Sequence, residues 1–290
     1  MPDQPIDAAP TSDVWAIQPP AAAVADLESA DSGDQGASSA EAPQRRRSSR
    51  PARTDWRLGG RTVHRWREGL LALALVSLGA AVLLASLVTT VWGSPWAAAS
   101  ATVLIWIGML LPVVWAFARS RPVGLLRLRP LDLLYGLVLG ALLRTSQGWI
   151  EGLGGMPAAF PTLLSVEGAP PAASVAMDVI APIVVAPVVE ELFFRGVVLI
   201  ALYTVLRRPF GPLTAALVAA LASTALFVLV HGITGAADVS GVIALSMLGV
   251  VCALLVLLTG RIWGAVLVHV VYNGTYVALA VIGSLLTELS

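Results

Sequence analysis

The stretch that decides the fold is APIVVAPVVEELFFRGVVLIALYTVL, residues 181–206. It exceeds the ~20 apolar residues that a helix needs to cross a bilayer core of ~30 Å. Its middle nevertheless contains Glu190, Glu191 and Arg195. Each ionisable side chain costs ~2.5–3.5 kcal/mol at the bilayer centre, so these three must face a polar cavity or one another. The stretch therefore predicts a membrane-spanning helix that carries a functional site.

The composition of the whole chain also indicates a membrane protein. Its 290 residues are 57% hydrophobic and 12% charged, with a mean hydropathy of +0.82. The net charge of zero averages two unlike regions, because eight acidic residues precede position 45 without a basic partner and nine Arg lie within residues 45–67. Net charge therefore says nothing about partners. The single cysteine, Cys252, excludes an intrachain disulfide.

The hydropathy pattern predicts an all-α, polytopic transmembrane helix bundle of about seven spans. The expected spans are 69–91, 96–118, 131–150, 176–205, 213–231, 241–259 and 262–285. Arg residues occur in the connectors on one side, whereas the connectors 93–95, 151–175 and 232–240 contain none. Cytoplasmic connectors are the ones enriched in Lys and Arg, so the N-terminus is expected in the cytosol.

The chain divides into two parts before and after the first span. Residues 1–68 form the predicted cytosolic tail, which is acidic and disordered up to about residue 44 because it has too little apolar surface to offset the entropy of ordering. The Arg-rich stretch 45–67 is expected to lie against anionic headgroups. Residues 69–290 form the predicted transmembrane domain.

Two other predicted spans contain a His. Phe227 and His231 lie one helical turn apart in ALFVLVHG, and His269 and Asn273 do so in VLVHVVYNGT. In the first long stretch, Glu191 and Arg195 have the same spacing, in the favourable order for an ion pair.

Residue counts along the helices test whether these groups meet. Glu190 lies 20 residues before a turn centred near residue 210, and His231 lies 21 after it, so an antiparallel hairpin brings them to similar depth. His269 lies only eight residues after Arg261 and is not placed at that depth by the same arithmetic. Either the fourth helix protrudes into the cytosol or the turn 260–264 lies deep, and the sequence does not decide between them.

The motifs EExxxR, FxxxH and HxxxN follow one another along the chain. Together, in this order, they resemble the signature of the CPBP family of intramembrane peptidases. This family is also called the ABI family and includes the type II CAAX prenyl endopeptidases. The resemblance covers roughly residues 130–280, and its implied candidate residues are Glu190, Glu191, His231, His269 and Asn273, with Arg195 and Phe227 in support.

The resemblance implies hydrolysis of peptide bonds inside the membrane. Glu190 would act as the general base that activates water, His231 would orient that water, and His269 and Asn273 would donate hydrogen bonds to the oxyanion. Glu191 would fix the helix that presents Glu190. Members are often named metalloproteases, and Glu190, His231 and His269 form a possible zinc ligand set. Because Asn273 is a poor zinc ligand, we favour a mechanism without a cofactor and keep zinc as the alternative.

The expected partners are the lipid bilayer and a membrane-embedded or lipid-anchored polypeptide substrate, with no nucleic acid. The Ala-rich composition without Lys hints at a GC-rich bacterial genome and hence a bacterial plasma membrane. Two other functions stay open: a non-catalytic immunity or scaffold protein of the same fold, and a proton-coupled transporter. A proton relay needs polar steps toward both membrane faces. The spans concentrate their polar residues in one cluster, which favours a site.

Overall fold

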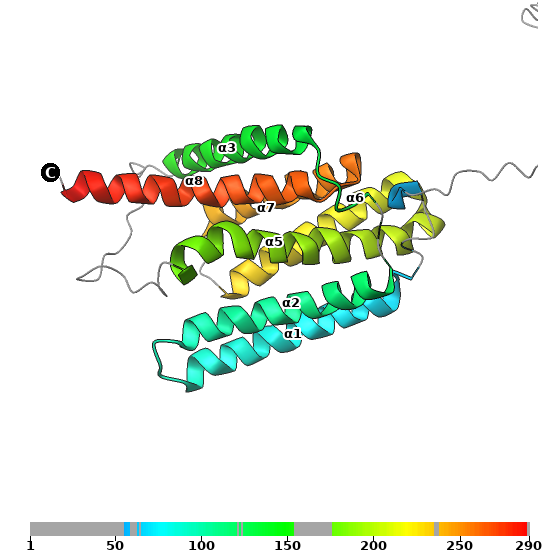
Figure 1. The fold of residues 1–290 in the computed structure, drawn as a ribbon, viewed down its shortest axis with the longest axis horizontal. Helices are drawn as coiled ribbons and strands as arrows, with labels where there is room; N and C mark the ends of the chain where they lie inside the picture. The colour runs from blue at the N-terminus through cyan, green and yellow to red at the C-terminus, as the bar shows by residue number, and fades with distance from the viewer. Residues whose placement is uncertain are drawn as a thin grey trace, which may run out of the picture. The chain divides into compact units, whose positions relative to one another are not determined.

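The computed structural model describes residues 55–58, 63, 65–120, 122, 124–153, 176–234 and 238–288. These residues form helices and connecting segments and include no strand, which confirms the predicted all-α fold (Figure 1). The elements are η1 (Trp56–Leu58), α1 (Glu68–Val91), α2 (Ala97–Arg119), α3 (Pro130–Leu153), η3 (Ala176–Val185), α5 (Ala186–Glu191), η4 (Leu192–Leu199), α6 (Ile200–Thr234), α7 (Val239–Thr259) and α8 (Trp263–Glu288).

The chain reverses direction within α6. Gly211 has a φ of 79°, which glycine adopts without steric cost, and it lies between Pro209 and Pro212. Proline has no N–H to donate, so the helix is interrupted at this point. Beyond the turn, the Ser223 hydroxyl donates to the Phe194 carbonyl at 2.8 Å. The two halves therefore run antiparallel, as the sequence predicted.

Five helical segments of the described residues are long and apolar enough to cross a membrane. They are Glu68–Val91, Ala97–Arg119, Val179–Thr234, Val239–Thr259 and Trp263–Gly283. Because the third segment reverses at Gly211, it can supply two passes. The expected span 131–150 lies in α3, which is not among the five segments. The span count of seven is therefore not confirmed.

The helix α3 packs closely along α8. A Cβ atom on Gly136 would lie 2.5 Å from the Cβ of Leu267, and one on Gly140 would lie 2.8 Å from the Cβ of Val271. Only glycine permits two backbones to approach so closely, which is the usual use of a small-xxx-small pair in a membrane helix. Figure 1 shows the two helices running side by side.

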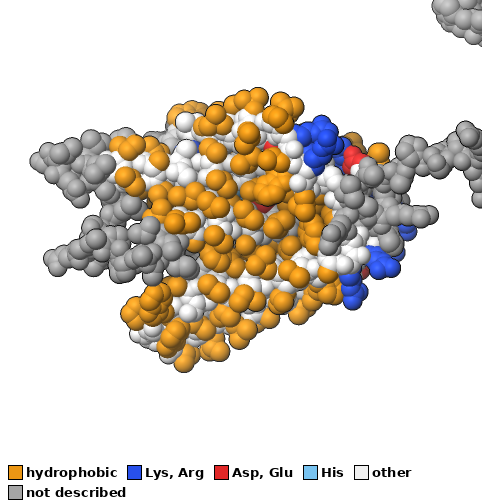
Figure 2. Space-filling view, viewed as in Figure 1, with side chains coloured by type: hydrophobic (Ala, Val, Ile, Leu, Met, Phe, Trp, Pro, Cys, Tyr) orange, Lys and Arg blue, Asp and Glu red, His pale blue; other side chains and the backbone are white. Residues whose placement is uncertain are grey.

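The surface of the bundle is apolar, with charge at one end. In the first hairpin the small residues Ala74 and Ala81 are buried, whereas the larger Val76 and Leu83 are 69% and 73% exposed. Small residues inside and large apolar residues outside suit a lipid environment. Figure 2 shows hydrophobic side chains over the visible face and Arg side chains gathered at one end of it.

The last part of the expected tail packs on the bundle. Residues 1–54 lie outside the described residues, so the disorder expected for the tail stays a prediction. Trp56, Val63 and Trp66, in contrast, are each 1% exposed. These side chains bring enough apolar area to pack on the bundle. The expected placement of the Arg-rich stretch 45–67 against anionic headgroups stays a prediction.

Candidate active site

The candidate site is built around a helix with irregular winding. Glu190 and Glu191 end the short helix α5, which has the π-helical segments η3 before it and η4 after it. In a π-helix the carbonyl of residue i accepts from the N–H of residue i+5. Pro187 has no N–H, so the carbonyl of Pro182, five residues earlier, is left without this partner. Segments of π-helix occur often at functional sites.

Glu190 faces two imidazole rings from different helices. Its Oε2 lies 3.7 Å from Nε2 of His231 and 3.9 Å from Nε2 of His269. These distances are longer than a direct hydrogen bond and are in the range that a bridging water spans. The side chains are 12% exposed for Glu190, 30% for His231 and 4% for His269, so the group is open to water mainly beside His231. The structure thus brings together the three ionisable residues that the motifs singled out.

Glu191 has a different environment from its neighbour. Its side chain is fully buried, and its Oε1 lies 2.9 Å from Nη1 of Arg195 and 3.1 Å from Nδ1 of His269. Arg195 is also fully buried, and its Nη2 donates to the Gly249 carbonyl at 3.3 Å. Glu191 therefore positions the His269 ring as well as pairing with Arg195, a contact that the spacing of the motifs did not predict.

The outer hydrogen bonds of the two rings orient their inner nitrogens. Nδ1 of His231 lies 2.9 Å from the Phe227 carbonyl, which can only accept, so this nitrogen carries the proton. In neutral His231, Nε2 then presents a lone pair toward Glu190. Nδ1 of His269 faces the Glu191 carboxylate and Nε2 faces Glu190. Each nitrogen of this ring therefore has a carboxylate beside it.

Phe227 forms an apolar wall beside both rings. Its ring centroid lies 4.3 Å from that of His231 and 5.8 Å from that of His269. The guanidinium of Arg195 lies 4.6 Å from the same centroid, within the range of a cation–π contact. The supporting positions expected for Phe227 and Arg195 therefore have a physical basis.

Asn273 is tied to the irregular helix. Its Nδ2 donates to the Pro182 carbonyl at 2.8 Å, which replaces the bond that Pro187 cannot make. An amide NH₂ has two donors, so the second N–H remains for another acceptor. Sequence reasoning missed this contact, although two prolines five residues apart were a usable signal.

The depth of His269 is explained by how the α7–α8 turn is covered. The N–H of Ile262 donates to the Leu125 carbonyl at 2.9 Å, and the Trp56 indole donates to the Gly260 carbonyl at 3.1 Å. The turn is therefore buried under other segments. Figure 1 also shows the hairpin end of α6 extending beyond the start of α8. The longer reach of α6 past the start of α8 accounts for the different residue counts, and the depth of either element in a bilayer stays a prediction.

The donor set of a zinc site can be compared with this geometry. Glu190, His231 and His269 supply one carboxylate and two imidazoles, a composition found in catalytic zinc sites. No group of three or more His, Cys, Asp or Glu side chains within the described ranges is arranged as a metal site. To hold a metal, these side chains would have to move.

An apolar pocket of about 320 Å³ lies against the helices that carry the site, and none of the candidate catalytic residues lines it. Val188 and Leu192 line it from either side of the Glu190–Glu191 pair along the helix, and Val266 lines it one turn before His269. The pocket continues to Leu126 and Trp263 at the Arg-rich end of the bundle.

Comparison with known protein families now identifies the domain. Residues 172–275 match the family model described as type II CAAX prenyl endopeptidase Rce1-like. The chain carries an Rce1-like domain. The match includes every candidate residue from Glu190 to Asn273 and leaves out α1, α2 and α3. No match was found among curated proteins or among solved structures. The Rce1-like domain supports intramembrane protease activity in general, on membrane-associated polypeptides, and agrees with the resemblance inferred from the motifs.

Proposed function

We propose that this protein is an intramembrane endopeptidase in which Glu190 activates the hydrolytic water. The observation that carries the proposal is the placement of Glu190 Oε2 at 3.7 and 3.9 Å from the two imidazole Nε2 atoms, inside an otherwise apolar bundle. A carboxylate and a ring lone pair at this separation can both accept from one water molecule. General bases act through such contacts when they are within reach of the water proton.

The proposed reaction has two proton transfers and one bond cleavage. Glu190 takes a proton from water while the water oxygen bonds to the scissile carbonyl carbon. His231 Nε2 accepts a hydrogen bond from the second water hydrogen, which stays on the oxygen. The carbonyl oxygen becomes the oxyanion. Glu190 then gives its proton to the amide nitrogen, the C–N bond breaks, and the products are a carboxylic acid and an amine. Glu190 is then deprotonated again, as it was at the start, and no oxidant or reductant is needed.

The oxyanion would be stabilised by two donors from α8. His269 donates from Nε2 when that nitrogen carries a proton, and the Glu191 contact at Nδ1 holds the ring in position. Asn273 donates its second amide N–H while the first holds Pro182. Removing one such donor in other enzymes costs about 3–4 kcal/mol of transition-state stabilisation.

The substrate class follows from the surroundings of the site. The pocket of Val188, Leu192 and Val266 lies against the helices that carry the site and suits an apolar part of a substrate. We therefore propose a membrane-embedded or lipid-anchored polypeptide as substrate. The Ala-rich composition without Lys supports our further proposal that this is a multi-pass protein of a bacterial plasma membrane.

The test compares peptides released from membranes that contain the wild-type protein or Glu190→Gln. The variant keeps the shape of the side chain and removes the base, so wild-type cleavage products should be absent. Glu68→Gln, at the exposed start of α1, is the matched control and should cleave normally. Persistent cleavage by Glu190→Gln would overturn the assignment of the base.

The zinc alternative is tested on the same preparation. Without a metal requirement, purified protein retains activity after chelation. Loss of one equivalent of zinc together with activity, and recovery of both on adding zinc, would replace the Glu190 mechanism with a metal mechanism.

A further inference from the structure

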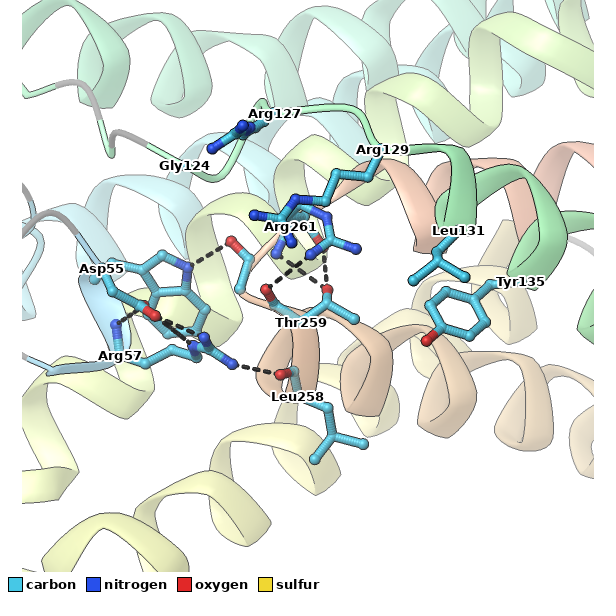
Figure 3. Close-up of a pocket in the computed structure, with 12 residues that line it drawn as sticks. Asp55, Arg57, Gly124, Arg127, Arg129, Leu131, Tyr135, Leu258, Thr259 and Arg261 are labelled. Atoms are coloured by element: carbon cyan, nitrogen blue, oxygen red, sulfur yellow. Dashed lines mark hydrogen bonds and ion pairs between the residues drawn. The ribbon is translucent and has the colours of Figure 1, made fainter.

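A second pocket lies at the Arg-rich end of the bundle. It has a volume of about 480 Å³ and lies between η1, the connection from α2 to α3, and the α7–α8 turn. Four guanidinium groups line it: Arg57, Arg127, Arg129 and Arg261 (Figure 3). None of the candidate catalytic residues lines this pocket. It is therefore distinct from the site described above.

Two of the four cations are already neutralised. Arg57 pairs with Asp55 at 2.6 Å, and Arg261 pairs with Asp132 at 2.8 Å. These pairs hold the pocket walls together, since Arg57 also donates to the Leu257 carbonyl at 3.4 Å at the end of α7. The positive charges of Arg57 and Arg261 are therefore balanced by carboxylates of the protein itself.

The other two cations have no such partner. Arg127 and Arg129 are exposed and form no ion pair with any carboxylate of the described residues. Their backbone is nevertheless fixed. The N–H of Arg129 donates to the Asp132 carboxylate at 2.8 Å, and Pro130 restricts the preceding residue to an extended conformation. Two positive side chains are thus presented to one cavity by an ordered segment.

The same segment alternates these cations with exposed leucines. Leu126, Leu128 and Leu131 are 49%, 55% and 52% exposed. The Trp263 indole donates to the Leu126 carbonyl at 2.8 Å, which fixes this segment to the start of α8. Trp side chains are enriched at membrane–water interfaces. In Figure 2 the Arg groups lie at the edge of the apolar surface, where headgroups of a bilayer would meet it.

We propose that this pocket binds the phosphate of an anionic phospholipid headgroup, with the acyl chains lying over the three exposed leucines. The guanidinium is planar and matches the oxygens of a phosphate with paired N–H donors. Basic pockets between transmembrane helices bind phosphate-bearing lipid headgroups in this way. A soluble phosphate would use the same arginines but would gain nothing from the leucines.

A lipid in this pocket would connect three segments of the protein. The headgroup would contact η1, the segment 124–131 and the turn 259–261 at once. That turn sets where α8 begins and hence the depth of His269. Bound lipid should therefore stabilise the folded protein, which provides a readout independent of peptide cleavage.

The experiment measures thermal unfolding of the full chain in neutral detergent micelles as phosphatidylglycerol is titrated in. The test variant is Arg127→Gln/Arg129→Gln. The control is Arg65→Gln/Arg208→Gln, which removes the same charge from exposed positions that do not line the pocket. Each basic residue near an anionic surface contributes enough for about a fivefold change in affinity, so the test variant should bind roughly ten- to thirtyfold more weakly. The control should stay within a few-fold of the wild type.

Parallel arms separate the sources of the anion. Phosphatidylcholine at the same concentrations and inorganic phosphate should give much smaller stabilisation than phosphatidylglycerol. Equal losses in both double variants would mean general surface attraction and would overturn the pocket. Equal protection by inorganic phosphate, or Arg127-dependent protection by a peptide with a free C-terminal carboxylate but none by lipid, would overturn the lipid assignment. Native mass spectra of the same variants should show fewer retained phosphatidylglycerol molecules on the test variant.

Discussion

Two adjacent carboxylates of the same type have different surroundings at the residue scale. Glu190 lies at the open side of the cluster, whereas Glu191 is fully buried between Arg195 and His269. A buried ion pair adds little net stability because both ions lose their hydration. Its value here is positional, since Glu191 fixes the ring that faces Glu190. The i,i+4 spacing in the motif predicted the pair of Glu191 with Arg195, but it did not predict the contact of Glu191 with His269.

The first prediction compares single and double removal of this buried pair. Glu191→Ala leaves Arg195 as an uncompensated buried charge and should lower the free energy of unfolding by about 3–5 kcal/mol. Glu191→Leu/Arg195→Met replaces both ions by apolar groups and should recover most of that loss without restoring cleavage. Denaturation of the purified variants in one detergent gives both values. A double variant no more stable than the single one would contradict the ion-pair account.

The second prediction concerns Asn273. As an oxyanion donor it acts mainly in the transition state, so Asn273→Ala should reduce kcat by about 10²–10³ with little change in KM. The variant also leaves the Pro182 carbonyl without its donor. Unfolding must therefore be measured alongside kinetics, and Asn273→Asp provides the control, because it keeps the size of the side chain and loses the donor. A large rise in KM at unchanged kcat would instead place Asn273 in ground-state binding.

At the scale of the elements, η1 acts as a cover on the end of α7. The Arg57 guanidinium donates to Asp55 and to the carbonyls of Leu257 and Leu258, and the Arg57 carbonyl accepts from Tyr203 and Arg207. Cations are favourable at the C-terminus of a helix because its last carbonyls carry partial negative charge. This three-residue element joins α6 to α7 near the turn that sets the position of α8.

The third prediction uses the pH dependence of this cover. The side-chain hydrogen bond from Arg57 lowers the pKa of Asp55 below its ordinary value of 3.8. A depressed folded-state pKa gives stability that is present above the unfolded value and is lost as pH falls through the folded one. The difference in melting temperature between wild type and Asp55→Asn should therefore be constant above about pH 5 and shrink as the pH falls below about 4. In an Arg57→Gln background the same substitution should have little pH-dependent effect.

The elements also show which parts of the site were predictable from sequence. The meeting of Glu190 and His231 followed from residue counts on either side of one turn, because both lie in a single hairpin. Residue counts did not predict the level of His269 along the bundle. That level depends on Trp56 and Leu125, which are distant in sequence and lie over the turn before α8. The link from Asn273 to Pro182 likewise depends on a π-helix that hydropathy does not reveal.

At the scale of the whole bundle, the open question is whether α3 crosses the membrane. Asp132 near its start pairs with Arg261 just before α8, and Arg144 farther along donates to the Tyr272 carbonyl at 2.8 Å. The two helices therefore run parallel from the Arg-rich end. Polar groups such as Arg144 lower the hydropathy of α3 but have partners on α8. A helix that follows a membrane-spanning neighbour over this length covers the same depth, which favours seven passes.

The final prediction tests this orientation with topology reporters fused after residues 125 and 160. Residue 125 precedes α3 on the Arg-rich side, and residue 160 follows it, beyond the described part of the helix. Positive connectors stay in the cytosol, so the first fusion should give a cytosolic signal and the second an external one. As a control, a fusion after residue 94, between α1 and α2, should be external. Two cytosolic signals at 125 and 160 would show that α3 does not cross, and an external signal at 125 would reverse the predicted orientation. The first result would refute the seven-span arrangement and the second its orientation, and both would leave the contacts of Glu190 with the two imidazoles unchanged.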